Sequence, residues 1–236
     1  LFPYTTLFRS TDLYSAVLLN GINAHINEFD DGHRFAMMHM GASIISVVLS
    51  ISSSKKLRGE KQLRAVIAGY EIAVNMARHM QPGHKIKGFH ATGTCGTIGC
   101  AMAIAVLLDY NRYQIQGTLS AATTSAAGIL EISNDSSELK PYNVGRAALD
   151  GVVAALTGYA GYRGSDDPVG GKQGFYAVFS DKYDFERVKH ISLFDSKEYA
   201  IKGIYIKPYA ACRHCHPAIE AALTIREKMD RDGANI

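Results

Sequence analysis

The chain has 236 residues and the composition of a folded globular protein. Hydrophobic residues make up 47% and charged residues 20% of the chain, which excludes an intrinsically disordered protein. The formal net charge is only +3 and no dense block of lysine and arginine occurs, so no nucleic-acid partner is expected. The longest apolar stretch, residues 42–51, is interrupted by serines and is far shorter than the roughly 20 residues of a membrane span, so no membrane partner is expected either.

The cysteine content and the N-terminal residues give information on the cellular compartment and on the nature of residues 1–10. Four cysteines in a chain of this length do not make a disulfide scaffold. No segment combines a basic start, an apolar run and a small-residue cleavage site, so we expect a cytoplasmic protein. Residues 1–10 have no helical periodicity, and we interpret them as a foreign or disordered tail.

Residues 11–183 predict a large all-helical domain. Apolar residues recur at steps of three and four over residues 60–80, which is typical of an amphipathic helix, and Pro82 and Gly83 end it. Asn111 and Gln114 have the spacing of a capping box. Alanine and glycine in the other segments allow helices to pack at short axial distances. The predicted helices span residues 12–29, 39–54, 60–80, 92–110, 111–128 and 143–162.

The composition changes after a loop at residues 164–171. Residues 201–207 alternate like a β-strand, and residues 217–230 are expected to form a helix. A single strand cannot satisfy its own backbone hydrogen bonds, so its partners must lie outside this sequence, or the segment is not a strand. We therefore expect residues 184–236 to be the beginning of a smaller α+β domain.

Three carboxylates, Glu28, Asp30 and Asp31, lie within four residues at the end of the first predicted helix. Such neighbouring charges raise at least one pKa unless a cation compensates. Clustered carboxylates also suit Mg²⁺ or Ca²⁺, and a solvated helix end is the alternative. Because the helix macrodipole disfavours anions at a C-terminus, we favour a functional site.

Two further residues lie at predicted helix starts. His90 precedes a helix whose free N–H groups attract carboxylates or phosphates and whose dipole lowers the pKa of a histidine. A neutral histidine beside an anion can act as a general base near pH 7, although a surface histidine is the alternative. Lys140 lies in a loop that leads into the helix predicted at residues 143–162, where a cation is disfavoured unless it faces an anion, and an exposed loop lysine is the alternative.

The segment Cys212–His216 matches the C-x-x-C-H pattern of covalent haem attachment. Cys212, Cys215 and a histidine could also bind zinc. We favour a cationic pocket for a polycarboxylate, because basic residues crowd beside a helix start and arginine binds a carboxylate with two hydrogen bonds. These basic residues are Lys207, Arg213, His214 and His216.

Taken in order, these segments resemble the MmgE/PrpD family, whose members include 2-methylcitrate dehydratase, cis-aconitate decarboxylase and an iminodisuccinate epimerase. The resemblance runs from about residue 12 to residue 230, and its specificity comes from the order and spacing of short motifs. The motifs are the stretch Asn20 to Asp31, Gly69-Tyr70-Glu71, Gly88-Phe89-His90-x-Thr92-Gly93-Thr94, Lys140 with Gly145-Arg146-Ala147-Ala148, Gly174-Phe175, Lys207-Pro208-Tyr209 and His216-Pro217.

The resemblance implies a helical domain topped by an α+β lid, a homodimer, and an active site that uses no cofactor and no metal. The positions that correspond to the family's catalytic residues are Glu28, His39, His90, Lys140 and Lys207. We expect the substrate to be bound by Asp31, Thr92, Arg213, His214 and His216.

The implied chemistry is proton transfer next to a carboxylate of a small polycarboxylate. His90 would remove the proton, while His39, assisted by Glu28 or Asp31, would protonate the leaving hydroxyl. We expect a 2-methylcitrate-like dehydratase; decarboxylation and epimerisation share its carbanion chemistry and stay open. Cys212 stands where the decarboxylase has a histidine, which argues against decarboxylation. An inactive helical fragment and a metal-binding module are the remaining alternatives.

Overall fold

A computed structural model describes residues 11–57, 59–135, 137–181 and 198–231. The expected mainly α architecture is confirmed: helices dominate, and the two short strands pair with each other. The α-helices are α1 (Leu13–His25), α2 (Gly41–Lys55), α3 (Glu60–Met80), α4 (Gly83–Ile86), α5 (Ala91–Leu107), α6 (Arg112–Ser125), α7 (Lys140–Tyr159), α8 (Phe175–Phe179) and α10 (His216–Arg231). Short 3-10 helices span Leu130–Ser133, Ala200–Gly203 and Arg213–Cys215, and the strands are β1 (Asp31–His33) and β2 (Ile204–Ile206).

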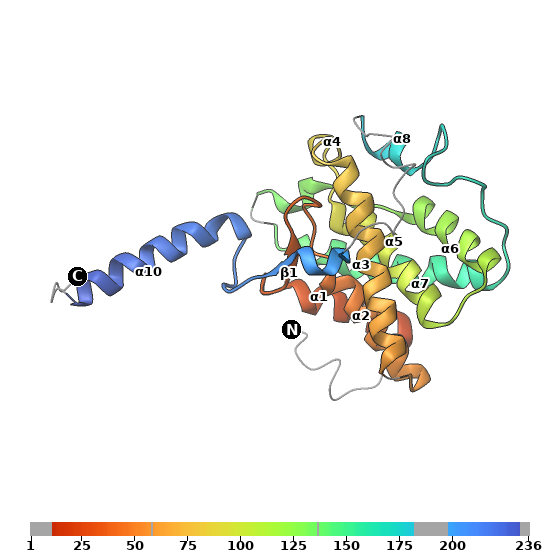
Figure 1. Ribbon diagram of the computed structural model, residues 1–236, viewed down its shortest axis with the longest axis horizontal. Coiled ribbons are helices and arrows are strands. Elements are labelled where there is room, and N and C mark those ends of the chain that lie inside the picture. The colour runs from red at the N-terminus through yellow and green to blue at the C-terminus, as the bar shows by residue number, and fades with distance from the viewer. Residues whose placement is uncertain (1–10, 58, 136, 182–197, 232–236) are drawn as a thin grey trace.

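Helix α5 lies at the centre of the helical body, where it packs against α3 and α7 (Figure 1). Nearly all of its residues are buried. Small residues make this close packing possible. A Cβ atom on Gly99 would lie 2.7 Å from the Cβ of Ala73 in α3, and one on Gly151 in α7 would lie 2.5 Å from the Cβ of Cys100. The structure thus confirms the expectation that glycine and alanine bring these helices together.

Local signals determine most helix boundaries. Helix α3 begins and ends where its periodicity predicts, and Asn111 and Gln114 form the predicted capping box at the start of α6. Helix α1, in contrast, ends at His25, earlier than the expected residue 29. The chain leaves the helix there because Glu28 has a φ of 51°, a left-handed conformation that an α-helix cannot contain.

The partner of strand β2 lies inside this sequence, so the expectation of partners outside it is wrong. β2 pairs antiparallel with β1, with Asp31 opposite Ile206 and His33 opposite Ile204. β1 has three residues and no alternating apolar pattern, which is why the sequence did not indicate it. Its central Gly32 lies against the Tyr205 ring, and a Cβ there would lie 2.4 Å from the Tyr205 hydroxyl unless that side chain moved.

Helix α10 follows β2 and projects away from the helical body (Figure 1). The expected start of a second domain at residue 184 lies outside the described residues, as does the suspected tail at residues 1–10. Within the described part of the chain, no helix combines the length and apolarity needed to cross a bilayer.

Candidate active site

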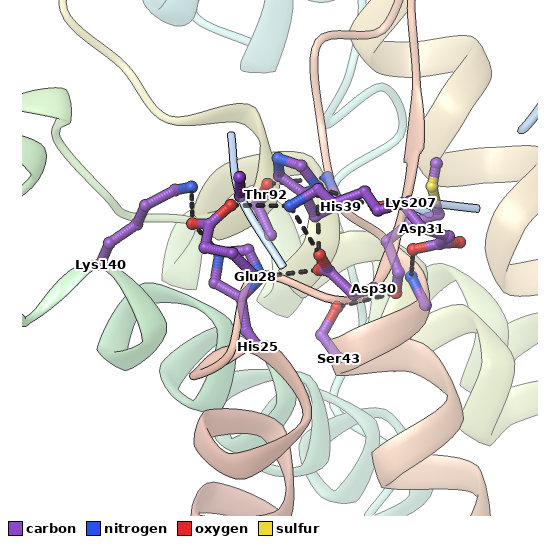
Figure 2. Close-up of polar contacts among 12 residues, drawn as sticks. His25, Glu28, Asp30, Asp31, His39, Ser43, Thr92, Lys140 and Lys207 are labelled. Atoms are coloured by element: carbon purple, nitrogen blue, oxygen red, sulfur yellow. Dashed lines mark hydrogen bonds and ion pairs between the residues drawn. The ribbon is translucent and has the colours of Figure 1, made fainter. Parts of the chain in front are cut away.

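Charged side chains from three separate parts of the chain meet beside the β1–β2 pair (Figure 2). Lys207, directly after β2, has a fully buried side chain whose ammonium nitrogen lies 2.7 Å from Glu28 Oε2 and 2.9 Å from Asp30 Oδ1. Lys140, the first residue of α7, contacts the other oxygen of the Glu28 carboxylate. We call Glu28, Asp30, Lys140 and Lys207 the carboxylate–lysine cluster. Lys140 therefore faces an anion, as the dipole argument required.

The β1–β2 pairing positions Lys207 in this cluster. The backbone N–H of Lys207 donates to the Asp30 carbonyl oxygen at 3.0 Å, directly next to the three paired residues of each strand. A short antiparallel contact between residues far apart in the sequence thereby sets one ammonium group against two carboxylates.

The three neighbouring carboxylates ionise differently because only two of them contact cations. Burial opposes the ionisation of Glu28, but the hydrogen bonds from Lys140 and Lys207 outweigh it and lower its pKa to about 2. Burial likewise opposes ionisation of Asp30, yet its contacts with His25 and Lys207 lower its pKa. Burial raises the pKa of Asp31, which has no cation beside it among the described residues. Cations thus compensate two of the three carboxylates, and the pKa of the third is raised chiefly by burial and only in smaller part by the neighbouring carboxylate that the sequence argument invoked.

Asp31 serves a different purpose from its neighbour Asp30. The Tyr70 hydroxyl donates to the Asp31 carboxylate at 2.8 Å, and the backbone N–H of Gly41 donates to it at 3.0 Å. Gly41 must lack a side chain, since a Cβ there would lie 2.4 Å from the Tyr70 hydroxyl. Successive residues of an extended chain point to opposite sides. Asp31 therefore ties α3 to the start of α2, and it is Asp30 whose carboxylate lies near His39, at 3.7 Å from Nδ1.

His39 is held by two backbone contacts. Its Nδ1 lies 2.8 Å from the carbonyl oxygen of Asp31, and its backbone N–H donates to the Thr92 hydroxyl at 3.0 Å. Burial lowers the pKa of His39 to about 4, although the Asp30 carboxylate acts in the opposite direction. In the structure, the Thr92 hydroxyl positions the His39 backbone, so its expected contact with a substrate stays a prediction.

His90 is buried at the N-terminus of α5, immediately before the first helical residue. Burial, together with the nearby His39 and Lys140, lowers its pKa to about 3. The sequence predicted a neutral histidine here from the helix dipole; burial is the largest cause. The side-chain amide of Asn143 in α7 lies 3.1 Å from His90 Nδ1.

His25, Asp30 and His39 each present a possible metal-ligating atom, and these atoms lie within 4.8 Å of one another. A metal ion there would face the Lys207 ammonium, which lies 2.9 Å from Asp30 Oδ1. A metal ion and an ammonium group that share one carboxylate repel each other strongly in a partly buried site. These residues fit the ion-pair network that is present better than they fit a metal ion.

The predicted basic residues after Lys207 contact their own segment. The Arg213 guanidinium lies over the Tyr205 ring at 5.4 Å, and the buried His216 contacts the Ala211 carbonyl oxygen at 3.1 Å. His214 Nδ1 lies 3.6 Å from Cys212 Sγ. A role of Arg213, His214 and His216 in binding a substrate stays a prediction. In the described part of the chain, Cys212 and Cys215 belong to no group of three clustered metal-ligating residues.

The sequence analysis assigned no role to His25, Tyr70 or Asn143, and it named Asp30 only as a member of the carboxylate group. The structure places His25 Nδ1 2.6 Å from the Asp30 carboxylate. One signal could have found Asn143: it follows Lys140 by three residues, and residues with this spacing lie on one face of a helix.

Comparison with known proteins supports a relationship over most of the chain. A family model described as the MmgE/PrpD N-terminal domain matches residues 4–188. Cis-aconitate decarboxylase of Mus musculus is 26% identical over 230 residues, which cover 94% of this chain and 45% of the relative. Cis-aconitate decarboxylase of Homo sapiens is 25% identical over 222 residues, which cover 91% of this chain and 44% of the relative. The chain thus spans less than half the length of these curated relatives.

Proposed function

Because this chain belongs to the MmgE/PrpD family, we propose that it acts as a lyase on a small polycarboxylate. One observation carries this proposal: two ammonium groups from distant segments, Lys140 and Lys207, bind the same carboxylate, that of Glu28. A carboxylate of a substrate would find the same two partners. Two converging cations also stabilise the negative charge that develops when a proton leaves the carbon next to a carboxylate.

Glu28 is suited to give way to a substrate. Its side chain is 25% exposed, whereas that of Lys207 is fully buried. Its backbone has a φ of 51°, which is unfavourable for a residue with a side chain. A substrate carboxylate that replaced Glu28 at Lys140 would leave the positive charge of the site balanced.

We propose dehydration of a 2-methylcitrate-like acid as the specific reaction. A C–H proton is removed next to a carboxylate, the charge is held by Lys140 and Lys207, and the hydroxyl group leaves as water. His39 and His90 are the two groups proposed to assist the proton transfer, and a positioned acid or base contributes roughly 10²–10⁴ to a rate. A homodimeric assembly, a cofactor-free reaction and a cytoplasmic location belong to the same proposal.

Decarboxylation is the second candidate, because the two relatives described above are named cis-aconitate decarboxylase. Breaking a C–COO⁻ bond leaves the same kind of carbanion and needs the same two cations. Cys212, which stands where the decarboxylase has a histidine, is exposed in the structure. Epimerisation would use the same proton transfer without loss of a group.

The test is incubation of the protein with 2-methylcitrate and, separately, with cis-aconitate, with the products followed by NMR. Loss of water identifies the dehydratase and loss of carbon dioxide the decarboxylase. Lys140→Met should lower kcat/KM by at least about 10²-fold, since it removes a charge from the reacting carboxylate. Lys61→Met, which removes an exposed lysine paired with Asp109, is the matched control and should change nothing. Turnover of neither acid, or full activity of Lys140→Met, would refute the proposal.

A further inference from the structure

The imidazole of His90 has one ring nitrogen whose protonation is set by a neighbouring amide. The side-chain nitrogen of Asn143 lies 3.1 Å from His90 Nδ1 and 3.4 Å from the carbonyl oxygen of Ile129. A carbonyl oxygen only accepts hydrogen bonds, so the Ile129 contact orients the amide with its NH₂ group toward both partners. An NH₂ group only donates. His90 Nδ1 must therefore be the acceptor, and the proton of the neutral ring is on Nε2.

In the imidazole of His39 the proton is on the other ring nitrogen, Nδ1. Its Nδ1 lies 2.8 Å from the backbone carbonyl oxygen of Asp31, which can only accept. The proton of this ring is therefore on Nδ1, and Nε2 keeps a free lone pair. The Asp30 carboxylate lies 3.7 Å from the same Nδ1 and would stabilise a positive charge on the ring.

We propose that Asn143 is a positioning residue that holds His90 as a neutral Nε2–H hydrogen-bond donor, and that His39 is the base. The inference rests on the proposed lyase function and reverses the roles that the sequence suggested for the two histidines. The C–H electron pair moves toward the adjacent carboxylate and forms an enediolate, and the proton moves to His39 Nε2. His90 keeps its proton and donates a hydrogen bond to the developing oxyanion, as neutral imidazoles do elsewhere. In a dehydration, His39 then returns the proton to the leaving hydroxyl, and water leaves.

The first experiment needs no activity. The 236-residue chain is labelled with ¹⁵N-histidine, and NMR at pH 7 reports which ring nitrogen carries the proton in each histidine. The signals are assigned by their loss in His90→Gln and in His39→Gln. The expected result is a proton on Nε2 of His90 and on Nδ1 of His39. A proton on Nδ1 of His90 would overturn the inference.

The second experiment changes the partner. Asn143→Asp presents only acceptors to His90, so the proton should move to Nδ1, and kcat for the acid that turns over should fall by about 10²-fold, the effect of losing an oxyanion donor. KM should change much less, because the donor acts on charge that develops in the reaction. Asn111→Asp makes the same chemical change at the exposed cap of α6 and should alter neither the spectrum nor the rate.

The outcomes separate the two proposals. If Asn143→Asp does not fold, as judged by circular dichroism, the spectrum of the wild-type chain still decides the tautomers. An Asn143→Asp protein that keeps the wild-type ¹⁵N pattern or full kcat refutes the role of Asn143. If neither acid turns over while the spectrum is as expected, the lyase proposal fails, the assignment of His39 as base fails with it, and the tautomers stand. If an acid turns over while His90 carries its proton on Nδ1, the inference fails and the lyase proposal stands.

Discussion

The centre of the helical body and the carboxylate–lysine cluster are stabilised by opposite means. Helix α5 is buried almost throughout and contacts its neighbours through glycine, alanine and threonine. The cluster has two lysines and two carboxylates that contact one another through ion pairs, brought together from residues 28–30, 140 and 207. The helical body is stabilised by many van der Waals contacts, each of which contributes little free energy by itself. In the cluster each charge depends on the others, because a buried ion without its partner is costly.

The largest expected effect comes from breaking the cluster at its buried cation. Lys207→Met leaves Glu28 and Asp30 without their shared ammonium, and losing one partner of a buried ion pair costs about 3–5 kcal/mol. The free energy of unfolding, measured by urea denaturation at pH 7, should fall by that amount. Lys202→Met removes an exposed lysine paired with Glu198 and should change it by less than about 0.5 kcal/mol. Equal effects of the two substitutions would mean that the cluster contributes no more than a surface ion pair.

A second prediction concerns the stability of the fold at acidic pH. The pKa values of His39 and His90 are lowered to about 4 and about 3, so below pH 6.5 the unfolded chain binds protons that the folded chain does not. The free energy of unfolding therefore decreases as the pH falls, for His90 by about 3 kcal/mol between pH 7 and pH 4. Glu28, with a pKa of about 2, adds a decrease below about pH 4.5. Asp31 acts in the opposite direction, because its pKa is raised.

His90→Gln tests the contribution of one group to this acid sensitivity. The variant has no imidazole to titrate at this position, so its free energy of unfolding should decrease less steeply between pH 7 and pH 4. His214→Gln replaces an exposed histidine and serves as the control. Parallel curves for His90→Gln and the wild type would show that His90 is not held neutral by the fold.

The smallest effect is expected inside the helical body, where two glycines of α5 give a matched pair. Gly99→Ala would bring a Cβ within 2.7 Å of Ala73 Cβ and 2.9 Å of the Gly69 carbonyl oxygen, and such overpacking costs about 1–3 kcal/mol. Gly96→Ala meets nothing closer than 3.4 Å and should gain up to about 1 kcal/mol from helix propensity. Thermal unfolding of both variants checks the difference, and a loss of stability in both would show that α5 tolerates no added methyl group.

The fold was predictable where its signals are local. Periodicity located α3, and the spacing of Asn111 and Gln114 located the start of α6. The β1–β2 pair was not predictable, because β1 is three residues long and its register depends on contacts with residues more than 170 positions away. A strand this short carries no alternating pattern of its own.

For the candidate site, the sequence indicated which residues to consider but not how their side chains are arranged. The motifs pointed to Glu28, His39, His90, Lys140 and Lys207, and the first and the last two of these meet in the cluster. The choice between Asp30 and Asp31 depends on which way each side chain points from an extended segment. Which ring nitrogen carries the proton likewise depends on contacts that no motif reveals. The contact is with the side-chain amide of Asn143 for His90 and with a backbone carbonyl oxygen for His39.

The antiparallel contact between β1 and β2 also sets the order in which this molecule can be completed. The ion pair between Glu28 and Lys207 joins residues separated by 179 positions. A growing polypeptide emerges with the Glu28 carboxylate long before the Lys207 ammonium group, and contacts over such separations form slowly. The helical body can therefore assemble before Glu28 and Asp30 have their ion pairs with Lys207. When β2 pairs with β1, it completes the small sheet and brings in this ammonium group.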